Sequence, residues 1–151
     1  MPLLRSACVI AGVHTQVAIT IHSDRITIIL TQLQKIGTVL DIRRDTSGPQ
    51  NMMRAMVADG AWRIRTLLGR RDDVLLQLLA RQLAEKVGAY SPLPLLLCVA
   101  LAGRRAGGGG GRQATQEQRR HDLFADPGAD VLHGLVGLVM TCLASRPLPE
   151  R

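Results

Sequence analysis

Alternation of apolar and polar residues with a period of two is the feature that most constrains this fold. It occupies the first third of the chain, over residues 13–21, 25–31 and 38–43. Successive side chains of a strand point to opposite faces, so the pattern predicts strands with one buried face and one wet face. Short connections between the three segments favour antiparallel pairing of consecutive strands. The expected core positions of the first two segments are Ile19, Ile21, Ile28 and Leu30.

The residues around this three-strand segment predict further elements. Apolar residues 7–11 precede it and end at Gly12, where a glycine indicates a bulge in one kinked strand or a break between two short ones. Residues 62–68 also alternate and predict another strand. Residues 95–101 are apolar at almost every position, which is typical of a central strand covered on both faces.

Two helices are predicted in the second half of the chain. Asp72 or Asp73 is a good N-cap for the first, and Gly88 is a natural stop. We expect a stripe on this helix to lie on the sheet: Leu76, Leu79, Ala80, Leu83 and Val87. Asp130 is the expected cap of the second helix. The predicted fold class is therefore α+β, an antiparallel sheet of about five or six strands with two main helices.

The length of 151 residues suits a single domain spanning residues 1–151. Within it, residues 103–128 form a Gly/Arg-rich insertion that we expect to be disordered, because it offers few apolar groups to bury. Three widely spaced cysteines without a C-x-x-C motif favour a reducing compartment and no zinc site. The longest apolar run is far shorter than the roughly 20 residues that cross a bilayer. We expect a soluble cytoplasmic protein without membrane contact.

The formal net charge of +7 comes from 17 arginines and 2 lysines. A basic RNA-binding module is therefore the alternative function. The arginines are dispersed as pairs, however, and the aromatic residues number only three, too few for a base-stacking platform. We expect no nucleic acid among the partners.

Catalytic and cofactor motifs are not recognisable. The glycine run that ends at Gly111 is followed by Arg-Gln rather than by the Lys-Ser/Thr of a phosphate loop. His14 and His22 share a strand face but lie about 26 Å apart at ~3.3 Å per residue, too far to hold one metal ion. We expect no catalytic residue, no cofactor and no metal, and an enzyme with an unrecognised motif is the third interpretation.

Three methionines, Met52, Met53 and Met56, lie in the long connection after the third alternating segment. Thioether side chains repack around different partners, so these residues are a candidate contact surface. Filling a gap in the core, or forming a short helical turn, explains them equally well.

Two short motifs resemble the proteasome assembly chaperone 3 family. They read Gly12-Val13-x-Thr15-Gln16-Val17 and, further along, Thr31-Gln32-x-x-Lys35-x-Gly37-Thr38. A second block agrees in order: Leu67-Leu68-Gly69, the acidic pair, the amphipathic helix and the apolar run that follows. Together the blocks cover roughly two thirds of the chain. The insertion departs from the family pattern, which has a much shorter connection there.

The resemblance implies a dedicated chaperone that works by binding protein. Members of this family pair with a related small assembly chaperone, and the pair holds alpha subunits of the 20S proteasome while the alpha ring forms, without nucleotide or metal. The implied partners are therefore proteasome alpha subunits and a related chaperone in a heterodimer, with a homodimer in isolation. The candidate protein-binding residues are Gln32, Lys35, Gly37, Thr38, Met52, Met53 and Met56. Turn formation alone is the alternative role of Gly37 and Thr38.

Overall fold

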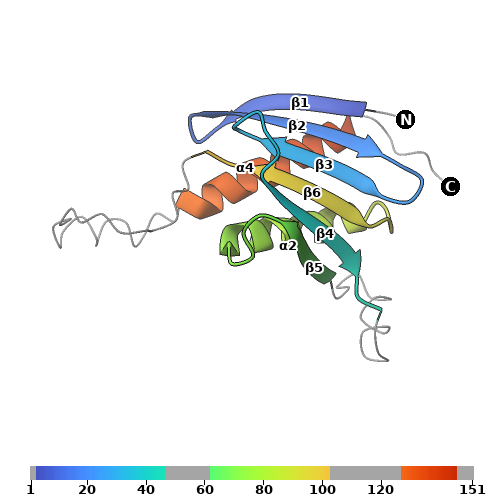
Figure 1. Cartoon of the computed structure of the whole chain (residues 1–151). Helices are drawn as coiled ribbons and strands as arrows, with labels where there is room; N and C mark the ends of the chain where they lie inside the picture. Colours follow the sequence, from blue (N-terminus) through green and yellow to red (C-terminus); the bar gives the residue numbers. More distant parts are fainter. Residues whose placement is uncertain (1–2, 47–61, 103–126, 146–151) are drawn as a thin grey trace.

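The computed structural model describes residues 3–46, 62–102 and 127–145. Its elements are, in chain order, β1 (Leu3–Ile10), β2 (Val13–Ile21), β3 (Ile26–Thr31), β4 (Thr38–Arg44), β5 (Trp62–Leu68), α2 (Val74–Gly88), β6 (Leu95–Ala100) and α4 (Pro127–Ala144). The strands form one six-stranded sheet in the order β1-β2-β3-β6-β4-β5 (Figure 1). The α+β class, the number of strands and the two helices confirm the prediction.

Strand β6 divides the sheet into two antiparallel parts. It pairs in parallel with β3 and antiparallel with β4. The prediction that β3 and β4 are neighbours is therefore wrong, whereas the β2–β3 pairing is confirmed. The almost wholly apolar β6 suits this interior position. Backbone bonds extend its pairing with β3 at both ends, from Ile26 N to Pro94 O at 2.9 Å and from Gln32 N to Ala100 O at 2.8 Å.

A tight hairpin joins β1 to β2, so the predicted bulge at Gly12 is wrong and the two-strand alternative holds. Ile10 and Val13 are partners in the ladder, which leaves only Ala11 and Gly12 in the turn. Both have positive φ, 49° and 76°. Positive φ at both central residues matches the right-handed twist of the flanking strands, and glycine adopts it without steric cost.

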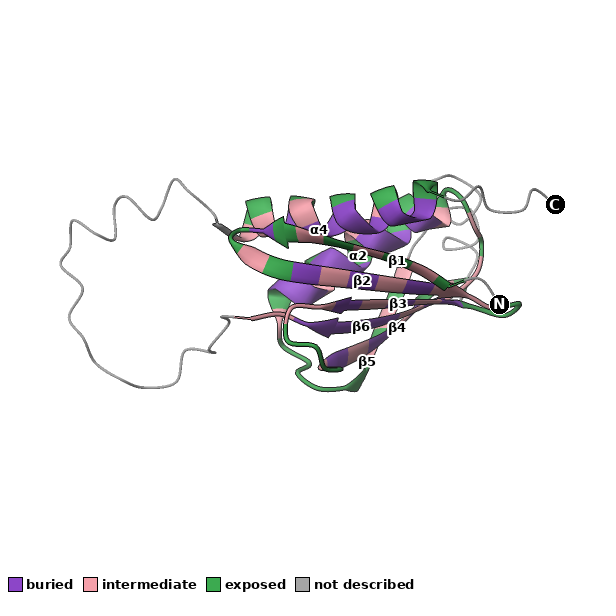
Figure 2. Ribbon diagram, turned by 90° about the horizontal axis from the view of Figure 1, so that it is seen from above, coloured by how far each residue is buried: buried purple, intermediate pink, exposed green. Residues whose placement is uncertain are grey.

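Both helices lie on the same face of the sheet (Figure 2). Helix α4 packs on β1 and β2, α2 packs on β4, β5 and β6, and the two helices contact each other. The leucine stripe of α2 is buried against the sheet as predicted. Of the predicted core residues, Ile19, Ile28 and Leu30 have no exposed surface, and Ile21 is partly buried.

Helix α2 begins and ends at the predicted residues. Asp73 Oδ1 accepts hydrogen bonds from Leu75 N at 3.1 Å and Leu76 N at 3.4 Å, which satisfies free amides of the first turn. At the other end, Arg44 Nη2 donates to the carbonyl of Gly88 at 2.9 Å. The helix is thus tied to the sheet at its last turn.

The predicted cap of α4 is wrong. This helix begins at Pro127, and Asp130 lies inside its first turn. Proline is tolerated at the start of a helix because the first amides have no intrahelical partner. An acidic residue inside the first turn still interacts favourably with the helix dipole, which explains the aspartate without a cap.

Two parts of the sequence-based interpretation lie outside the described residues. They are the methionine-bearing connection at residues 47–61 and the insertion at residues 103–128, apart from its last two residues, which begin α4. Within the described ranges, neither helix combines the length and the apolar character that crossing a membrane requires.

Candidate functional site

The face of the sheet that points away from α2 and α4 is not covered by any described helix or strand. We call it the open face. The expectation that β6 is covered on both sides is therefore wrong for the described residues, because both helices pack on the opposite face. The outward positions of β6 nevertheless remain apolar: Leu96, Cys98 and Ala100. An apolar central strand facing outward is typical of a surface that binds another protein.

One line of cross-strand partners runs over all six strands of the open face. We call it the central row, and its members are Arg5, Ala18, Ile29, Cys98, Val39 and Leu68. Five of the six are apolar. Cross-strand partners lie side by side on one face, so the row is a continuous apolar band with a cation at the β1 edge.

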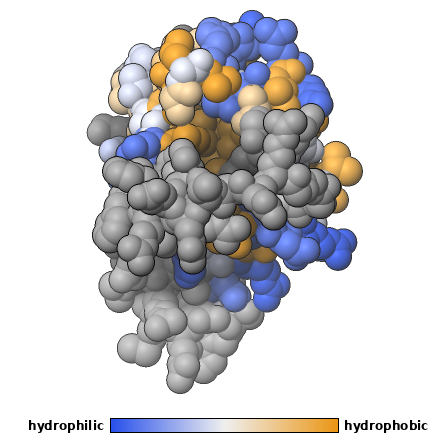
Figure 3. All heavy atoms as spheres, turned by 90° about the vertical axis from the view of Figure 1, so that its left-hand side faces the viewer, coloured by the Kyte–Doolittle hydropathy of each residue, from blue (hydrophilic) through white to orange (hydrophobic). Residues whose placement is uncertain are grey.

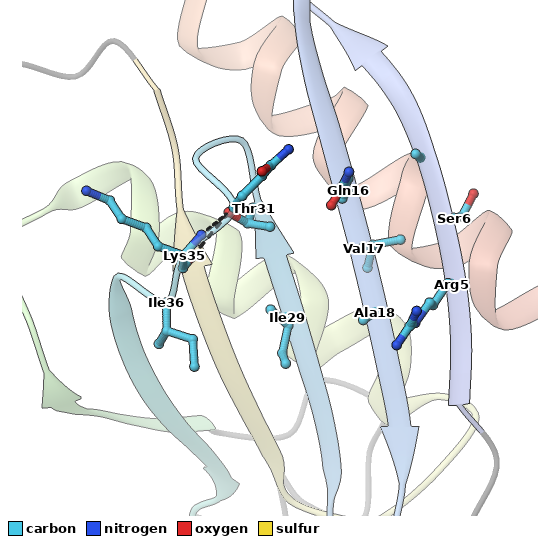
Figure 4. Close-up of a pocket in the computed structure, with 11 residues that line it drawn as sticks. Arg5, Ser6, Gln16, Val17, Ala18, Ile29, Thr31, Lys35 and Ile36 are labelled. Carbon is cyan, nitrogen blue, oxygen red and sulfur yellow. Dashed lines mark hydrogen bonds between the residues drawn. The ribbon is translucent and has the colours of Figure 1, made fainter.

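A groove of about 830 Å³ lies over the β1 side of the central row. Its lining includes Arg5, Ala18 and Ile29 from the sheet and Lys35 and Ile36 from the β3–β4 connection. Figure 4 shows these side chains in front of the strands, with both helices behind. The Ile36 side chain is 61 % exposed, so the groove presents apolar surface to solvent.

The thiol of Cys98 contributes packing surface rather than reactivity. It lies beside Ile29 and Val39 in the central row and is 7 % exposed. Burial raises the pKa of this thiol. The group is therefore protonated at neutral pH, and a protonated thiol is a poor nucleophile.

Gln32, the first of the predicted site residues, joins three strands. Its Nε2 donates to Thr15 Oγ1 at 2.9 Å, and its Oε1 accepts from Ala102 N at 3.0 Å. The Thr15 hydroxyl in turn donates to the Val13 carbonyl at 3.1 Å. The side chain thus links β2 to the residues that follow β6.

We predict that Gln32→Ala lowers the free energy of unfolding by about 1–3 kcal/mol, because Ala102 N and the fully buried Thr15 lose a partner. Urea denaturation followed by circular dichroism measures this change. Lys35→Ala is the matched control, since that side chain is exposed, and it should change stability by less than ~0.5 kcal/mol. Equal stability of Gln32→Ala and the wild type would contradict a bridging role.

Gly37 and Thr38 lie where the β3–β4 connection meets β6. A Cβ atom on Gly37 would lie 2.4 Å from the Val99 carbonyl oxygen, so only glycine allows this approach. Thr38 is buried, and its hydroxyl lies 2.6 Å from where a Cβ on Gly69 would be. The close contacts give both residues a role in packing.

Lys35 is the predicted site residue that reaches the groove. Its side chain is exposed, while its backbone N donates to Thr31 Oγ1 at 3.3 Å and its carbonyl accepts from the same hydroxyl at 3.2 Å. The threonine therefore fixes the connection that presents Lys35 and Ile36. Figure 3 views the side of the molecule that lies at the left of Figure 1, and there hydrophobic and hydrophilic side chains lie next to each other.

The predicted site is thus only partly brought together by the fold. Lys35 lines the groove, whereas Gln32, Gly37 and Thr38 are not part of its lining. The three methionines are outside the described residues. Sequence reasoning missed Ala18, Ile29 and Ile36. The available signal was the second face of residues 26–31, where an isoleucine occupies the outward position between two threonines.

A search of the described ranges for three or more His, Cys, Asp or Glu side chains that could hold a metal ion finds none. His14 and His22 lie at opposite ends of β2, with His14 exposed and within 3.2 Å of Gln16 Nε2. The described site therefore offers apolar contact and cationic side chains.

Comparison with known proteins connects this surface to a family. The chain matches the family model for proteasome assembly chaperone 3 over residues 28–107. It is 46 % identical over 46 residues to proteasome assembly chaperone 3 from Nematostella vectensis, a match that covers 30 % of this chain and 34 % of that relative. The match thus spans about a third of the length of the relative.

A solved structure shares the fold. A chain of the crystal structure of a novel chaperone complex for yeast 20S proteasome assembly has a TM-score of 0.58, with 96 % of this chain and 98 % of that chain covered. The identity is 12 %, so the likeness concerns the fold. The family match, by contrast, spans more than half of the chain and includes β6, most of β3 and the connection that borders the groove. This chain belongs to the proteasome assembly chaperone 3 family.

Proposed function

We propose that this protein is a cytoplasmic chaperone for assembly of the 20S proteasome core particle. In this proposal it pairs with a related small chaperone through the open face, and the pair holds an alpha subunit while the alpha ring forms. Membership of the family supports the chaperone role. The observation that carries the pairing is the apolar central row on a face that no described helix or strand covers.

The chemistry of the open face favours a protein partner. Ile29 lies between Ala18 and Cys98, and Ile36 lines the same groove from the β3–β4 connection. Complete burial of an aliphatic side chain of this size contributes about 1.5–3 kcal/mol. Ile29 is already partly buried and Ile36 is 61 % exposed, so a partner that covers the groove gains a fraction of this amount from each. A buried apolar centre with a polar border is the usual anatomy of a protein interface.

A chain that holds a partner and an alpha subunit together needs a second surface. We place the alpha-subunit contact on the connection that leaves β4 at Arg44 and returns at Trp62, which carries the methionines predicted as an adaptable contact. Strands β4 and β5 lie at the opposite edge of the sheet from β1.

The pairing is tested with Ile29→Asp. A carboxylate in the centre of the row must be desolvated when a partner covers it, so binding of the related chaperone should weaken at least about thirtyfold, as for a central hot spot of ~2 kcal/mol. The measurement is affinity capture by the intact protein from its own cytosol, with quantitative mass spectrometry of the related chaperone and the alpha subunits.

Leu78→Asp is the matched control for this experiment. Leu78 is 48 % exposed on α2, on the other side of the sheet, so its substitution should leave capture unchanged. Circular dichroism of both variants tests whether they are folded. Equal capture by wild type and Ile29→Asp would overturn the open face as the interface, and recovery of RNA without proteasome proteins would overturn the chaperone function.

A further inference from the structure

The charged side chains that border the groove have one sign. Among the described residues that line it, the ionised groups are the cations Arg5 and Lys35, and no carboxylate is present. Neither cation forms an ion pair with a described residue. Arg5 stands at the β1 end of the central row, and Lys35 stands on the β3–β4 connection. The apolar groove therefore has cations at two separate points of its border.

The opposite edge of the open face is also cationic. Arg65 on β5 is the cross-strand partner of Asp41, but the Asp41 carboxylate is already bound by Arg43 Nε at 2.8 Å. Asp45 lies 3.9 Å from Arg63. The two acidic groups on this side are thus neutralised by neighbouring arginines, and Arg65 adds a third positive charge. We call Arg5, Lys35 and Arg65 the cationic rim.

The sign of this rim matters for the choice of partner. A second copy of the chain presents the same apolar row and the same three cations, so pairing between two copies brings surfaces of like charge together. A related chain with carboxylates at its border gains attraction from the same contact. Like-charge contact is a means by which proteins reject wrong partners while an apolar centre supplies affinity.

We propose that the cationic rim selects the partner of the open face, favouring a related sheet with an apolar centre and an acidic border over a second copy of this chain. This inference rests on the proposed function, because it assumes that the open face receives the partner chaperone. Arg5, Lys35 and Arg65 are the specificity-determining residues, and Ile29 and its neighbours in the central row supply the affinity.

The experiment uses this chain as its own partner. A variant with Arg5→Glu, Lys35→Glu and Arg65→Glu keeps the apolar row and has an acidic border. Wild type and variant, each carrying a different fluorophore, are titrated against themselves and against each other. At low salt the mixed pair should bind at least about tenfold more tightly than the wild-type pair, and the difference should shrink at about 1 M salt, where the Debye length is about 3 Å.

A control that reverses cations behind the sheet separates the rim from a general charge effect. Arg81→Glu with Lys86→Glu reverses two exposed cations on α2, behind the sheet, and should produce no preference for the mixed pair. The inference is overturned if the affinity of the mixed pair is no higher than that of the wild-type pair. It is also overturned if neither pair forms. A preference that persists unchanged at high salt overturns it as well.

The failure of this inference can be told from the failure of the proposed function. If Ile29→Asp abolishes capture of the related chaperone but reversal of the rim leaves that capture unchanged, the rim has no selective role and the open face stands. If Ile29→Asp leaves capture unchanged, the interface lies elsewhere, and the proposed pairing fails together with the selection that rests on it.

Discussion

Ile28→Asp should abolish the folded state. Ile28 has no exposed surface, and its lateral neighbours are Ile19 on β2 and Leu97 on β6, both also fully buried. A carboxylate there has no partner and must either remain charged in an apolar core or take up a proton, at a cost of several kcal/mol. The total stability of a domain is only ~5–15 kcal/mol, so little or none remains. Circular dichroism and thermal unfolding of the purified variant measure the effect.

Ile29→Asp provides a direct comparison, since the same substitution one residue further along falls on the open face. There the carboxylate remains accessible to water in the unpaired chain, and the fold should survive with a much smaller loss of stability. Thus the Ile28→Asp protein should be unfolded, whereas the Ile29→Asp protein should be folded but should bind the related chaperone weakly. An Ile28→Asp protein with wild-type thermal stability would contradict the assignment of buried and open faces.

Gly37→Ala should lower the free energy of unfolding by about 3 kcal/mol, at the upper end of the usual cost of overpacking. The added Cβ would lie 2.4 Å from the Val99 carbonyl oxygen and 3.2 Å from the Ala100 Cα atom. Both are backbone atoms of β6, so neither can move aside as a flexible side chain can. Urea denaturation of the variant measures the loss.

Gly137→Ala is the control for the glycine substitution. It lies within α4, and a Cβ atom there would meet nothing within 4 Å. Alanine is favoured over glycine inside a helix, so this variant should gain up to about 1 kcal/mol. A Gly37→Ala protein as stable as the wild type would show that the β3–β4 connection can shift away from β6.

Features that depend on a local sequence pattern could be predicted for this fold, whereas pairing between distant strands could not. Alternation over β2 and β3 identified the buried faces correctly, since burial requires one face of a strand to be apolar. It said nothing about which strand lies beside which. The pairing of β3 with β6 joins residues about seventy positions apart, so a local pattern of alternation does not reveal it.

The candidate site was harder to predict than the core. A strand with two apolar faces indicates burial on both sides, and β6 gave that signal although no described element covers its outward face. Apolar residues on both faces of a strand are compatible with a strand buried on both sides and with a strand whose outward face binds another protein. Gln32, Gly37 and Thr38 were predicted as site residues because they belong to a motif that resembles a family. In the structure Gln32 forms hydrogen bonds, and Gly37 and Thr38 pack closely against neighbouring residues.

The central position of β6 also determines when the sheet can be completed during synthesis of the chain. β6 is the last of the described strands along the chain, yet it stands between β3 and β4. The β1–β2–β3 unit and the β4–β5 hairpin can each form from local contacts while the chain is still growing. They cannot join into one sheet until Ala100 has left the ribosome. Until then β3 and β4 each have an edge without its neighbour, and such edges invite aggregation. A chain that stalls before β6 is made should therefore depend on other chaperones, although the finished protein is proposed to be one itself.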